Sequence, residues 1–269
     1  MHVTTADKRA TFKKLHESGC FILPNPVDVG SAKALQHLGF KAIASSSAGF
    51  AWTIGKADNR VTIEDVCQHL AALSSSVDIP VNADFEGGFA VEPDQVVDHV
   101  ERGVRTGVAG LSIEDSTGDK DKPLYDRALA VERIKASRKA IGDSNTMLVG
   151  RCEAYLWGVT DLKLVIDRLT AYADAGADCL YAPGLKTRED IAAVVKAVAP
   201  KPFNLLIGAS GLSLKEAEDL GVRRISVGGS LARAAWGGFM RAAKEMAEKG
   251  TFSELGSGYP GGELNKMFS

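Results

Sequence analysis

Short stretches of hydrophobic residues, many of them β-branched, recur along the chain, and each is followed by a segment with helical periodicity. The first pattern is typical of buried strands and the second of amphipathic helices. The expected strands are FILPNP from Phe21, KAIASS from Lys41, IPVNADF from Ile79, GVAGLSIED from Gly107, TMLVGRCE from Thr146, ADCLYAP from Ala177, KPFNLLIG from Lys201 and VRRISVGG from Val222. The expected helices cover 62–76, 93–106, 127–141, 161–175, 187–198, 213–220 and about 230–249.

This alternation predicts parallel strands joined by crossover helices. Eight such units close more naturally into a barrel than into an open sheet, because an open sheet would expose two edges. We therefore predict an α/β fold with a single (β/α)8 TIM barrel domain over residues 1–269, in which 230–269 form the last helix and a C-terminal extension. A doubly wound open sheet is the alternative, but no GxGxxG follows the first strand.

The composition favours a globular protein that acts on a small molecule. Hydrophobic residues make up 45% of the chain and the net charge is only -2, with both signs spread along it, so nucleic acid is a poor candidate partner. No run of about 18 apolar residues could cross a membrane, and the N-terminus lacks the apolar stretch of a signal peptide. The four cysteines show no metal-binding spacing, so we expect a cytoplasmic protein in which they belong to the core.

Acidic residues recur where the predicted strands end, which in a barrel is the mouth that carries the chemistry. They are Asp84 and Glu86 after the third strand, Glu114 after the fourth and Asp58 in the long loop after the second. Carboxylates that meet at one mouth repel one another unless a cation lies between them, so the pattern predicts a hard divalent metal, Mg²⁺ or alternatively Mn²⁺. Ion pairs with lysine and arginine, or helix capping, are the competing explanation for each acid taken alone.

The residues around these acids support a ligand site. Strand alternation places Asp84 and Glu86 on one face, and Gly87-Gly88 leaves room for a ligand. Ser45-Ser46-Ser47-Ala48-Gly49 could hold an anion through its backbone N–H groups, or could be an ordinary turn. Arg151 could bind a substrate carboxylate, in competition with an ion pair to Glu153 or Glu114. For Gly228-Gly229 we favour tight packing over phosphate binding, and no histidine falls on the expected rim.

In this order the motifs resemble the isocitrate lyase/phosphoenolpyruvate mutase superfamily, from PNPVDVGSAKALQHLGFKAIASSSAG through the eighth strand. SSSAGFAWTIGKADN is similar to its anion-binding turn, NADFEGGF to its metal-site strand, and IED and GRCEAY to its next two strand ends. The resemblance implies that Asp84 binds Mg²⁺ directly while Asp58, Glu86 and Glu114 hold its waters. It also implies that the backbone of Ser46, Ser47 and Ala48 binds an α-oxo carboxylate and that Arg151 neutralises the other anionic end, with Asn204 nearby.

The loop after the fourth strand departs from the superfamily pattern. It reads STGDKDKPLY over 116–125, without the cysteine and histidine of isocitrate and methylisocitrate lyases or the asparagine of the mutases, and Pro183 replaces a common histidine or glutamate. What the resemblance still implies is a pyruvyl enolate stabilised by magnesium. Tyr125, Lys122 or a metal-bound water would then supply the proton, with Arg151 and Glu114 also taking part in catalysis.

We therefore expect a magnesium-dependent lyase that cleaves a C–C bond of a small α-oxo or α-hydroxy di- or tricarboxylate, with oxaloacetate-like decarboxylation the simplest case. Three alternatives stay open: P–C bond chemistry as a phosphonopyruvate hydrolase or mutase, methylisocitrate lyase-like activity with an acid other than cysteine, and a catalytically weak barrel that binds a keto acid. The resemblance also implies a homotetramer, or a dimer, that exchanges the eighth helix. A break at Gly237-Gly238 before Phe239 would be compatible with that exchange.

Overall fold

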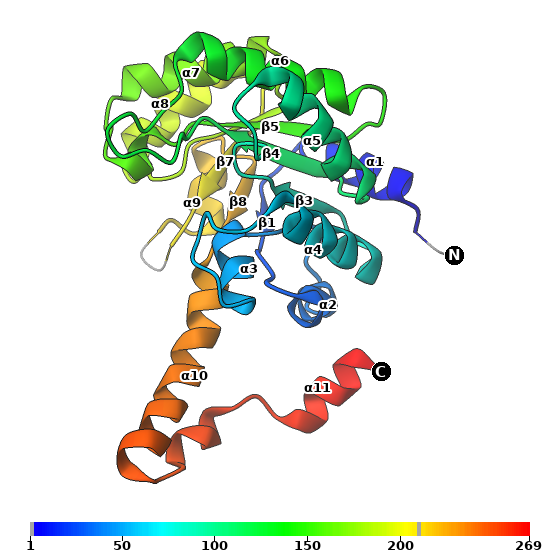
Figure 1. Ribbon diagram of the computed structural model, residues 1–269, viewed down its shortest axis with the longest axis vertical. Coiled ribbons are helices and arrows are strands. Elements are labelled where there is room, and N and C mark those ends of the chain that lie inside the picture. Colours follow the sequence, from blue (N-terminus) through cyan, green and yellow to red (C-terminus); the bar gives the residue numbers. More distant parts are fainter. Residues whose placement is uncertain (1–2, 209–210) are drawn as a thin grey trace.

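The computed structural model describes residues 3–208 and 211–269, and within them eight parallel strands form one sheet (Figure 1). In sheet order these are β1 (Phe21–Leu23), β8 (Arg224–Ser226), β7 (Phe203–Leu206), β6 (Cys179–Tyr181), β5 (Met147–Arg151), β4 (Gly110–Glu114), β3 (Val81–Asp84) and β2 (Ile43–Ala44). A backbone hydrogen bond from the Ala44 N–H to the Pro24 carbonyl, 3.0 Å long, links the two remaining edges. The sheet is therefore a nearly closed barrel, which confirms the predicted (β/α)8 fold.

Helices alternate with these strands along the chain, as the periodicity predicts. They are α1 (Thr5–Leu15), α2 (Val29–His37), α3 (Ser47–Thr53), α4 (Ile63–Ser76), α5 (Pro93–Arg105), α6 (Arg127–Ile141), α7 (Leu162–Asp174), α8 (Arg188–Val198), α9 (Leu214–Asp219), α10 (Ser230–Lys249) and α11 (Gly261–Phe268), with 3₁₀ turns η1 (Ala154–Trp157) and η2 (Ser253–Ser257). Local signals explain the boundaries: Thr62 and Ser213 each form a capping box, and Pro93 occupies the first turn of α5.

The strands are shorter than predicted, and four helices lie outside the predicted helical segments: α1, α2, α3 and, in the predicted C-terminal extension, α11. FILPNP forms a strand only over Phe21–Leu23, and the second strand shrinks to Ile43–Ala44. The second strand ends early because Ser46 begins a helix: its side chain accepts the Gly49 N–H and caps α3 inside what we expected to be a loop. The helices α1 and α2 also precede the segments in which helical periodicity was expected.

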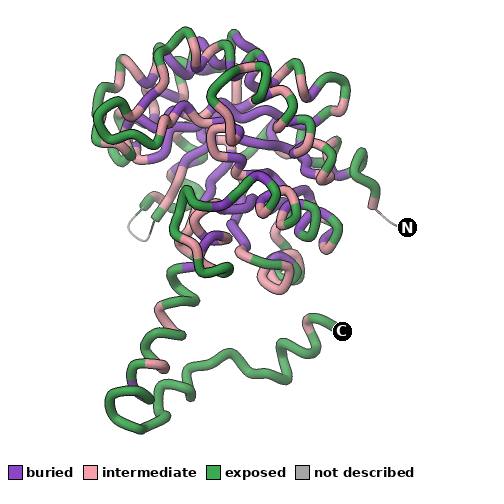
Figure 2. The backbone as a smooth tube through the Cα atoms, in the orientation of Figure 1, coloured by how far each residue is buried: buried purple, intermediate pink, exposed green. Residues whose placement is uncertain are grey.

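The hydrophobic core lies between the sheet and the outer helices, and helix α1 closes the end of the barrel at which the strands begin. Figure 2 shows buried backbone concentrated along the strands. Phe12 from α1 is fully buried and clusters with Leu23, Ala42 and Met147 at the end opposite the strands' carboxyl termini. Above this apolar plug the barrel interior turns polar, and its buried side chains include Asn82, Ser112, Asn204, Arg224 and Ser226. A polar interior next to the strand ends is where a small charged ligand can be held.

The last forty residues form an arm rather than part of the barrel wall. Helix α10 leads away from the barrel, and the chain then turns through η2 so that α11 returns beside α2 (Figure 1). Helix α10 runs without interruption through Gly237 and Gly238, so the expected break is wrong; both glycines keep the helical conformation. No helix among the described residues is both long enough and apolar enough to span a membrane.

Candidate active site

A cavity of about 160 Å³ opens at the carboxyl ends of the strands. Seven of the residues predicted from the sequence line it: Ser46, Ser47, Ala48, Asp58, Asp84, Arg151 and Asn204. They come from β3, β5, β7 and the segment that follows β2, so segments far apart in the sequence meet at one mouth as parallel strands require.

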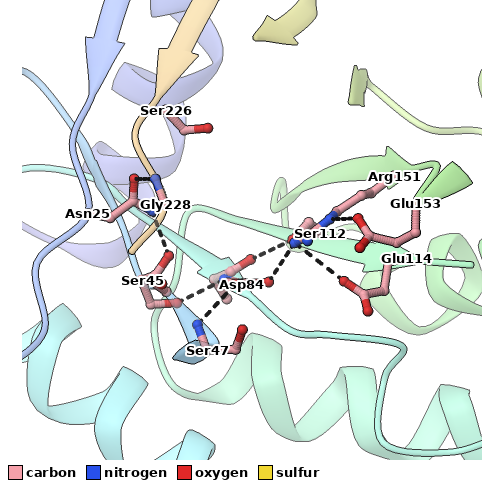
Figure 3. Close-up of polar contacts among 12 residues, drawn as sticks. Asn25, Ser45, Ser47, Asp84, Ser112, Glu114, Arg151, Glu153, Ser226 and Gly228 are labelled. Carbon is pink, nitrogen blue, oxygen red and sulfur yellow. Dashed lines mark hydrogen bonds and ion pairs between the residues drawn. The ribbon is translucent and has the colours of Figure 1, made fainter. Parts of the chain in front are cut away.

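Asp84, at the end of β3, is hydrogen-bonded to the serine turn, the segment over 45–49 that follows β2 (Figure 3). Its backbone N–H donates to the Ser45 hydroxyl at 2.8 Å, and its carboxylate oxygen Oδ2 accepts the Ser47 N–H at 3.0 Å. The turn therefore already holds an anionic group with a backbone N–H at the start of α3, which is the type of contact that an anion-binding turn provides. In this structure the anion is the carboxylate of Asp84.

Arg151, at the end of β5, lies among three carboxylates (Figure 3). Its Nη1 is 3.1 Å from Asp84 Oδ1 and 3.3 Å from Glu114 Oε2, and its Nε is 2.5 Å from Glu153 Oε1. Although burial opposes it, the charges of Glu153, Glu114 and Asp84 raise the pKa of Arg151 well above its usual range. The internal ion pairs that competed with substrate binding in the sequence prediction are therefore formed, with both glutamates and with Asp84 as well.

Glu86 reaches the site by a different route from the one predicted. Strand β3 ends at Asp84, and Glu86 has a φ of 47°, so a turn and not strand alternation places its side chain. Its Oε1 is buried without a hydrogen-bond partner among the described residues. Burial, followed by the charges of Asp84 and Asp58, raises the pKa of Glu86 to about 8.

The pKa values of Glu114 and Asp58 are also raised. Burial raises the pKa of Glu114 well above its usual range despite the nearby charge of Arg151. Burial and the charge of Asp84 also raise the pKa of Asp58. Glu86 and Glu114 do not line the cavity itself; Glu114 lies behind Arg151 and Glu86 follows Asp84.

An oxygen-rich site with an orphaned buried carboxylate oxygen fits a hard divalent cation, because such a cation would satisfy that oxygen and relieve the repulsion. Within the described chain, no three histidine, cysteine or acidic side chains already converge as a finished metal site. The metal ligands Asp58, Asp84, Glu86 and Glu114 therefore stay a prediction, supported by the donor chemistry.

Gly87 and Gly88 do not make room for a ligand as the sequence suggested. A Cβ on Gly87 would lie 3.1 Å from the Arg133 guanidinium, and one on Gly88 would touch Ile113 and Val96. Arg133 donates to the Gly87 carbonyl and, at 2.6 Å, to that of Val91. These glycines allow close packing of the turn after β3 against α6, which holds the backbone that carries Glu86.

The two candidate proton donors on the loop over 116–125 lie outside the cavity. Lys122 is exposed and forms an ion pair with Asp126 at 3.1 Å. The Tyr125 ring lies under the Arg133 guanidinium, 4.3 Å from ring centroid to Cζ. The structure therefore places Tyr125 against α6 and Lys122 toward solvent.

Other residues that line the cavity were not predicted as site residues. They are Leu23, Asn25, Ala44, Asn82, Ser112, Tyr181, Leu206, Arg224 and Ser226. Asn82 and Ser112 stand two positions before Asp84 and Glu114, so the period of two along a strand was the signal that could have found them.

The turn after β8 is held from the neighbouring strand β1, by the side chain of Asn25 just beyond its end. Asn25 accepts the N–H groups of Val227 and Gly228 at 3.0 and 2.9 Å, and its Nδ2 donates to the Ser45 carbonyl at 2.8 Å (Figure 3). A Cβ on Gly229 would lie 3.2 Å from the Trp52 ring. This close approach supports the packing interpretation of Gly228-Gly229, although both glycines also line the cavity.

Comparisons with known proteins point to one family. The family model for phosphoenolpyruvate phosphomutase matches residues 12–247. A protein from Burkholderia cenocepacia, named as a candidate lyase/mutase, is 44% identical, with a TM-score of 0.94 over 98% of this chain and 96% of that one. Oxaloacetate decarboxylase from Rhodopseudomonas palustris is 26% identical over 82% of this chain and 77% of its own.

A third relative was solved with a small dicarboxylate. Oxaloacetate acetylhydrolase in complex with its product oxalate is 25% identical, with a TM-score of 0.86, and the match covers 98% of this chain and 94% of that one. By name, one of these three relatives is a lyase/mutase, one a decarboxylase of oxaloacetate and one an acetylhydrolase of oxaloacetate. The chain belongs to the phosphoenolpyruvate phosphomutase family, within the PEP mutase/isocitrate lyase superfamily.

Proposed function

We propose that this protein is a magnesium-dependent lyase that cleaves a C–C bond of a small α-oxo dicarboxylate, with oxaloacetate decarboxylation as its simplest reaction. The observation that carries the proposal is the position of Arg151 among Asp84, Glu114 and Glu153 at the wall of a cavity of about 160 Å³. The negative excess favours a cation, and the cavity suits an acid of a few carbon atoms. Two of the relatives above are named for reactions of oxaloacetate.

Asp84 would hold the metal directly, and Asp58, Glu86 and Glu114 would hold its waters. When bound, Mg²⁺ would supply positive charge that stabilises the negative charge building on the substrate's oxygens. These four residues combine one orphaned buried oxygen with three raised carboxyl pKa values, so a cation would relieve a cost that the folded chain otherwise carries.

Other residues that line the same cavity would contact the substrate. The backbone N–H groups at the start of α3, from Ser46 to Ala48, would bind the α-oxo carboxylate, in exchange for the present contact between Ser47 and Asp84. Arg151 would neutralise the second carboxylate, and its position is set by the acids on either side. Asn204, buried on β7 and hydrogen-bonded to Ser226 at 3.0 Å, would contribute a fixed amide beside them.

The test is magnesium-dependent formation of pyruvate from oxaloacetate, corrected for the decarboxylation that Mg²⁺ causes without protein. We expect Asp84→Asn to lower turnover about 100-fold or more, because it removes an electrostatic partner of the reacting centre. Asp174→Asn, at an exposed position at the end of α7, is the matched control and should be fully active. Equal turnover by Asp84→Asn and the unchanged protein would refute the proposal.

P–C bond chemistry on phosphonopyruvate is the second candidate, and the match to the phosphoenolpyruvate phosphomutase model over 12–247 favours it. The loop over 116–125 argues against it, because it lacks the asparagine expected of the mutases. Phosphorus NMR of a phosphonopyruvate incubation distinguishes the outcomes: free phosphate indicates a hydrolase, phosphoenolpyruvate indicates a mutase, and an unchanged spectrum excludes both.

A further inference from the structure

We propose that Tyr181 is the acid that protonates the enolate carbon after C–C cleavage. This inference rests on the proposed function, which leaves a pyruvyl enolate in need of a proton. It replaces neither Arg151 nor the acids in their expected roles, and it assigns the step that the sequence left open between Tyr125, Lys122 and water.

The position of Tyr181 in the barrel is rigid and faces inward. It is the last residue of β6, paired in register with Arg151 of β5 and Asn204 of β7. The Cys152 N–H donates to its carbonyl at 2.8 Å, which fixes the backbone at the strand end. The side chain packs with Val149 and Cys179 inside the barrel and is only 8% exposed, yet it lines the cavity. A side chain held by a strand is placed more accurately than one on a loop.

Among the described residues that line the cavity, Tyr181 provides the only phenol. The serine hydroxyls, including that of Ser45 beside Asp84, are far weaker acids. Asp58 and Asp84 belong to the set expected to face the cation, and an arginine does not release its proton in proteins. By elimination, the phenol is the one neutral O–H acid in the cavity with suitable chemistry.

The surroundings of Tyr181 keep the phenol protonated at rest and place one cation against its ring. The Arg151 guanidinium carbon lies 5.1 Å from the ring centroid, so a cation faces the phenolate that donation creates. Burial and the charges of Glu153 and Asp84 raise the pKa of Tyr181 to about 12, although the charge of Arg151 and a hydrogen bond to Ser226 lower it. The resting side chain at neutral pH is therefore the protonated phenol.

The step balances as follows. The bond between C3 and the leaving carboxylate breaks, CO₂ departs, and the electron pair of that bond becomes the enolate. The enolate carbon C3 then takes the proton of the Tyr181 hydroxyl, which yields pyruvate and a phenolate. Water returns a proton to the phenolate, so the net change is oxaloacetate plus one proton giving pyruvate and CO₂.

The experiment follows the stereochemistry of protonation. A 3-methyl-substituted oxaloacetate is decarboxylated in D₂O with Mg²⁺, and the 2-oxobutanoate is reduced at once by an NADH-dependent dehydrogenase so that the configuration at C3 can be read by NMR. A fixed acid delivers deuterium to one face, whereas an enol released into solvent takes it on both. We expect one configuration from the unchanged protein and from Tyr155→Phe, a tyrosine of η1 outside the cavity.

Tyr181→Phe should lose about 100-fold or more in ketone formation and give both configurations. Its oxalate affinity with Mg²⁺, measured by calorimetry, should stay unchanged and so show that the site is intact. Retention of rate and configuration in Tyr181→Phe, loss of configuration in Tyr125→Phe instead, or mixed configuration from the unchanged protein would each overturn the role of Tyr181. Absence of CO₂ release by the unchanged protein would overturn the proposed function itself.

Discussion

At the scale of single residues, one side chain that lines the cavity is a buried cation with no acidic partner among the described residues. Arg224 is 2% exposed and donates to Asn204 Oδ1 at 2.8 Å, to Asn82 Oδ1 at 3.3 Å and to His16 Nε2 at 3.4 Å. His16 in turn donates from Nδ1 to the Phe12 carbonyl at 2.7 Å. This arrangement requires a neutral imidazole, because a protonated His16 would face Arg224 without a counter-charge.

The pH dependence of folding should report this requirement. Burial, with the charge of Arg224, lowers the pKa of His16 from 6.5 to about 3. The unfolded chain then takes up a proton below pH 6.5 that the folded chain refuses until about pH 3. The free energy of unfolding should therefore fall as pH decreases through this window, by up to about 1.4 kcal/mol per pH unit from this group.

Urea denaturation of His16→Gln between pH 4 and 7 measures the effect. We expect the slope of the free energy of unfolding against pH to decrease in the variant by the contribution of about one proton. The variant should also be roughly 1 kcal/mol less stable at pH 7, because a buried hydrogen bond is altered. His37→Gln, at an exposed position at the end of α2, should keep the slope of the unchanged protein. A slope shared by all three proteins would mean that His16 titrates normally in the folded state.

The sequence alone predicted those residues of the candidate site that lie at strand ends. It did not predict Tyr181, which lies inside the barrel, or the turn that positions Glu86. Asp84, Arg151 and Ser46 could be predicted because parallel strands bring their carboxyl ends together whatever the details of packing. Tyr181 was not singled out, because an aromatic residue in a strand is more often core, and its exposure to the cavity depends on side chains from neighbouring strands. Glu86 was placed near the right neighbours for the wrong reason, since its turn has a positive φ that alternation cannot predict.

At the scale of elements, one buried carboxylate joins the ends of β4 and β5 to helix α7. Asp115, 2% exposed, accepts the Glu153 N–H at 2.8 Å through Oδ1. Its Oδ2 accepts the Arg168 guanidinium at 3.0 Å and the Tyr172 hydroxyl at 2.6 Å. The acids beside the cavity thus depend on a contact made behind the sheet.

Removal of the arginine should be costly. Arg168→Met would leave the charge of Asp115 buried and uncompensated, and we expect a loss of about 3–5 kcal/mol in the free energy of unfolding. The double variant Asp115→Asn with Arg168→Met should recover a large part of that loss, since no charge then remains buried. Arg127→Met, which breaks an exposed ion pair with Asp167, should cost less than about 1 kcal/mol.

Urea unfolding of the three variants decides the matter. A loss in Arg168→Met no greater than that in Arg127→Met would show that solvent reaches Asp115 and that its contact with Arg168 is not structural.

The helices themselves were the most predictable elements, as α6 illustrates with the predicted bounds of Arg127–Ile141. The strands were predicted too long because the residues at their ends form turns and helix caps instead, as Ser46 does before α3.

At the scale of the whole molecule, the arm over 230–269 exposes an amount of apolar surface that a monomer rarely keeps. Its exposed large side chains include Trp236, Phe239, Phe252, Leu255 and Tyr259, and Phe239 is 61% exposed. The arm leaves the barrel and buries little on its own chain (Figure 2). We therefore propose that this surface packs against other copies of the chain, in a homotetramer or a dimer, and that the exchange of α10 implied by the family resemblance provides the contact.

Light scattering of the purified protein should give two or four times the chain mass of 28.5 kDa. Phe239→Glu should lower that mass, because it places a charge in the apolar face that the partner covers, whereas Lys244→Glu places the same acidic side chain at an exposed polar position of α10, with an even larger change of charge, and should leave the mass unchanged. Since α10 begins at the turn that lines the cavity, the dissociated variant should also lose turnover. A mass of one chain for the unchanged protein would show that the arm has another purpose, and full activity of a dissociated Phe239→Glu would show that the site does not depend on assembly.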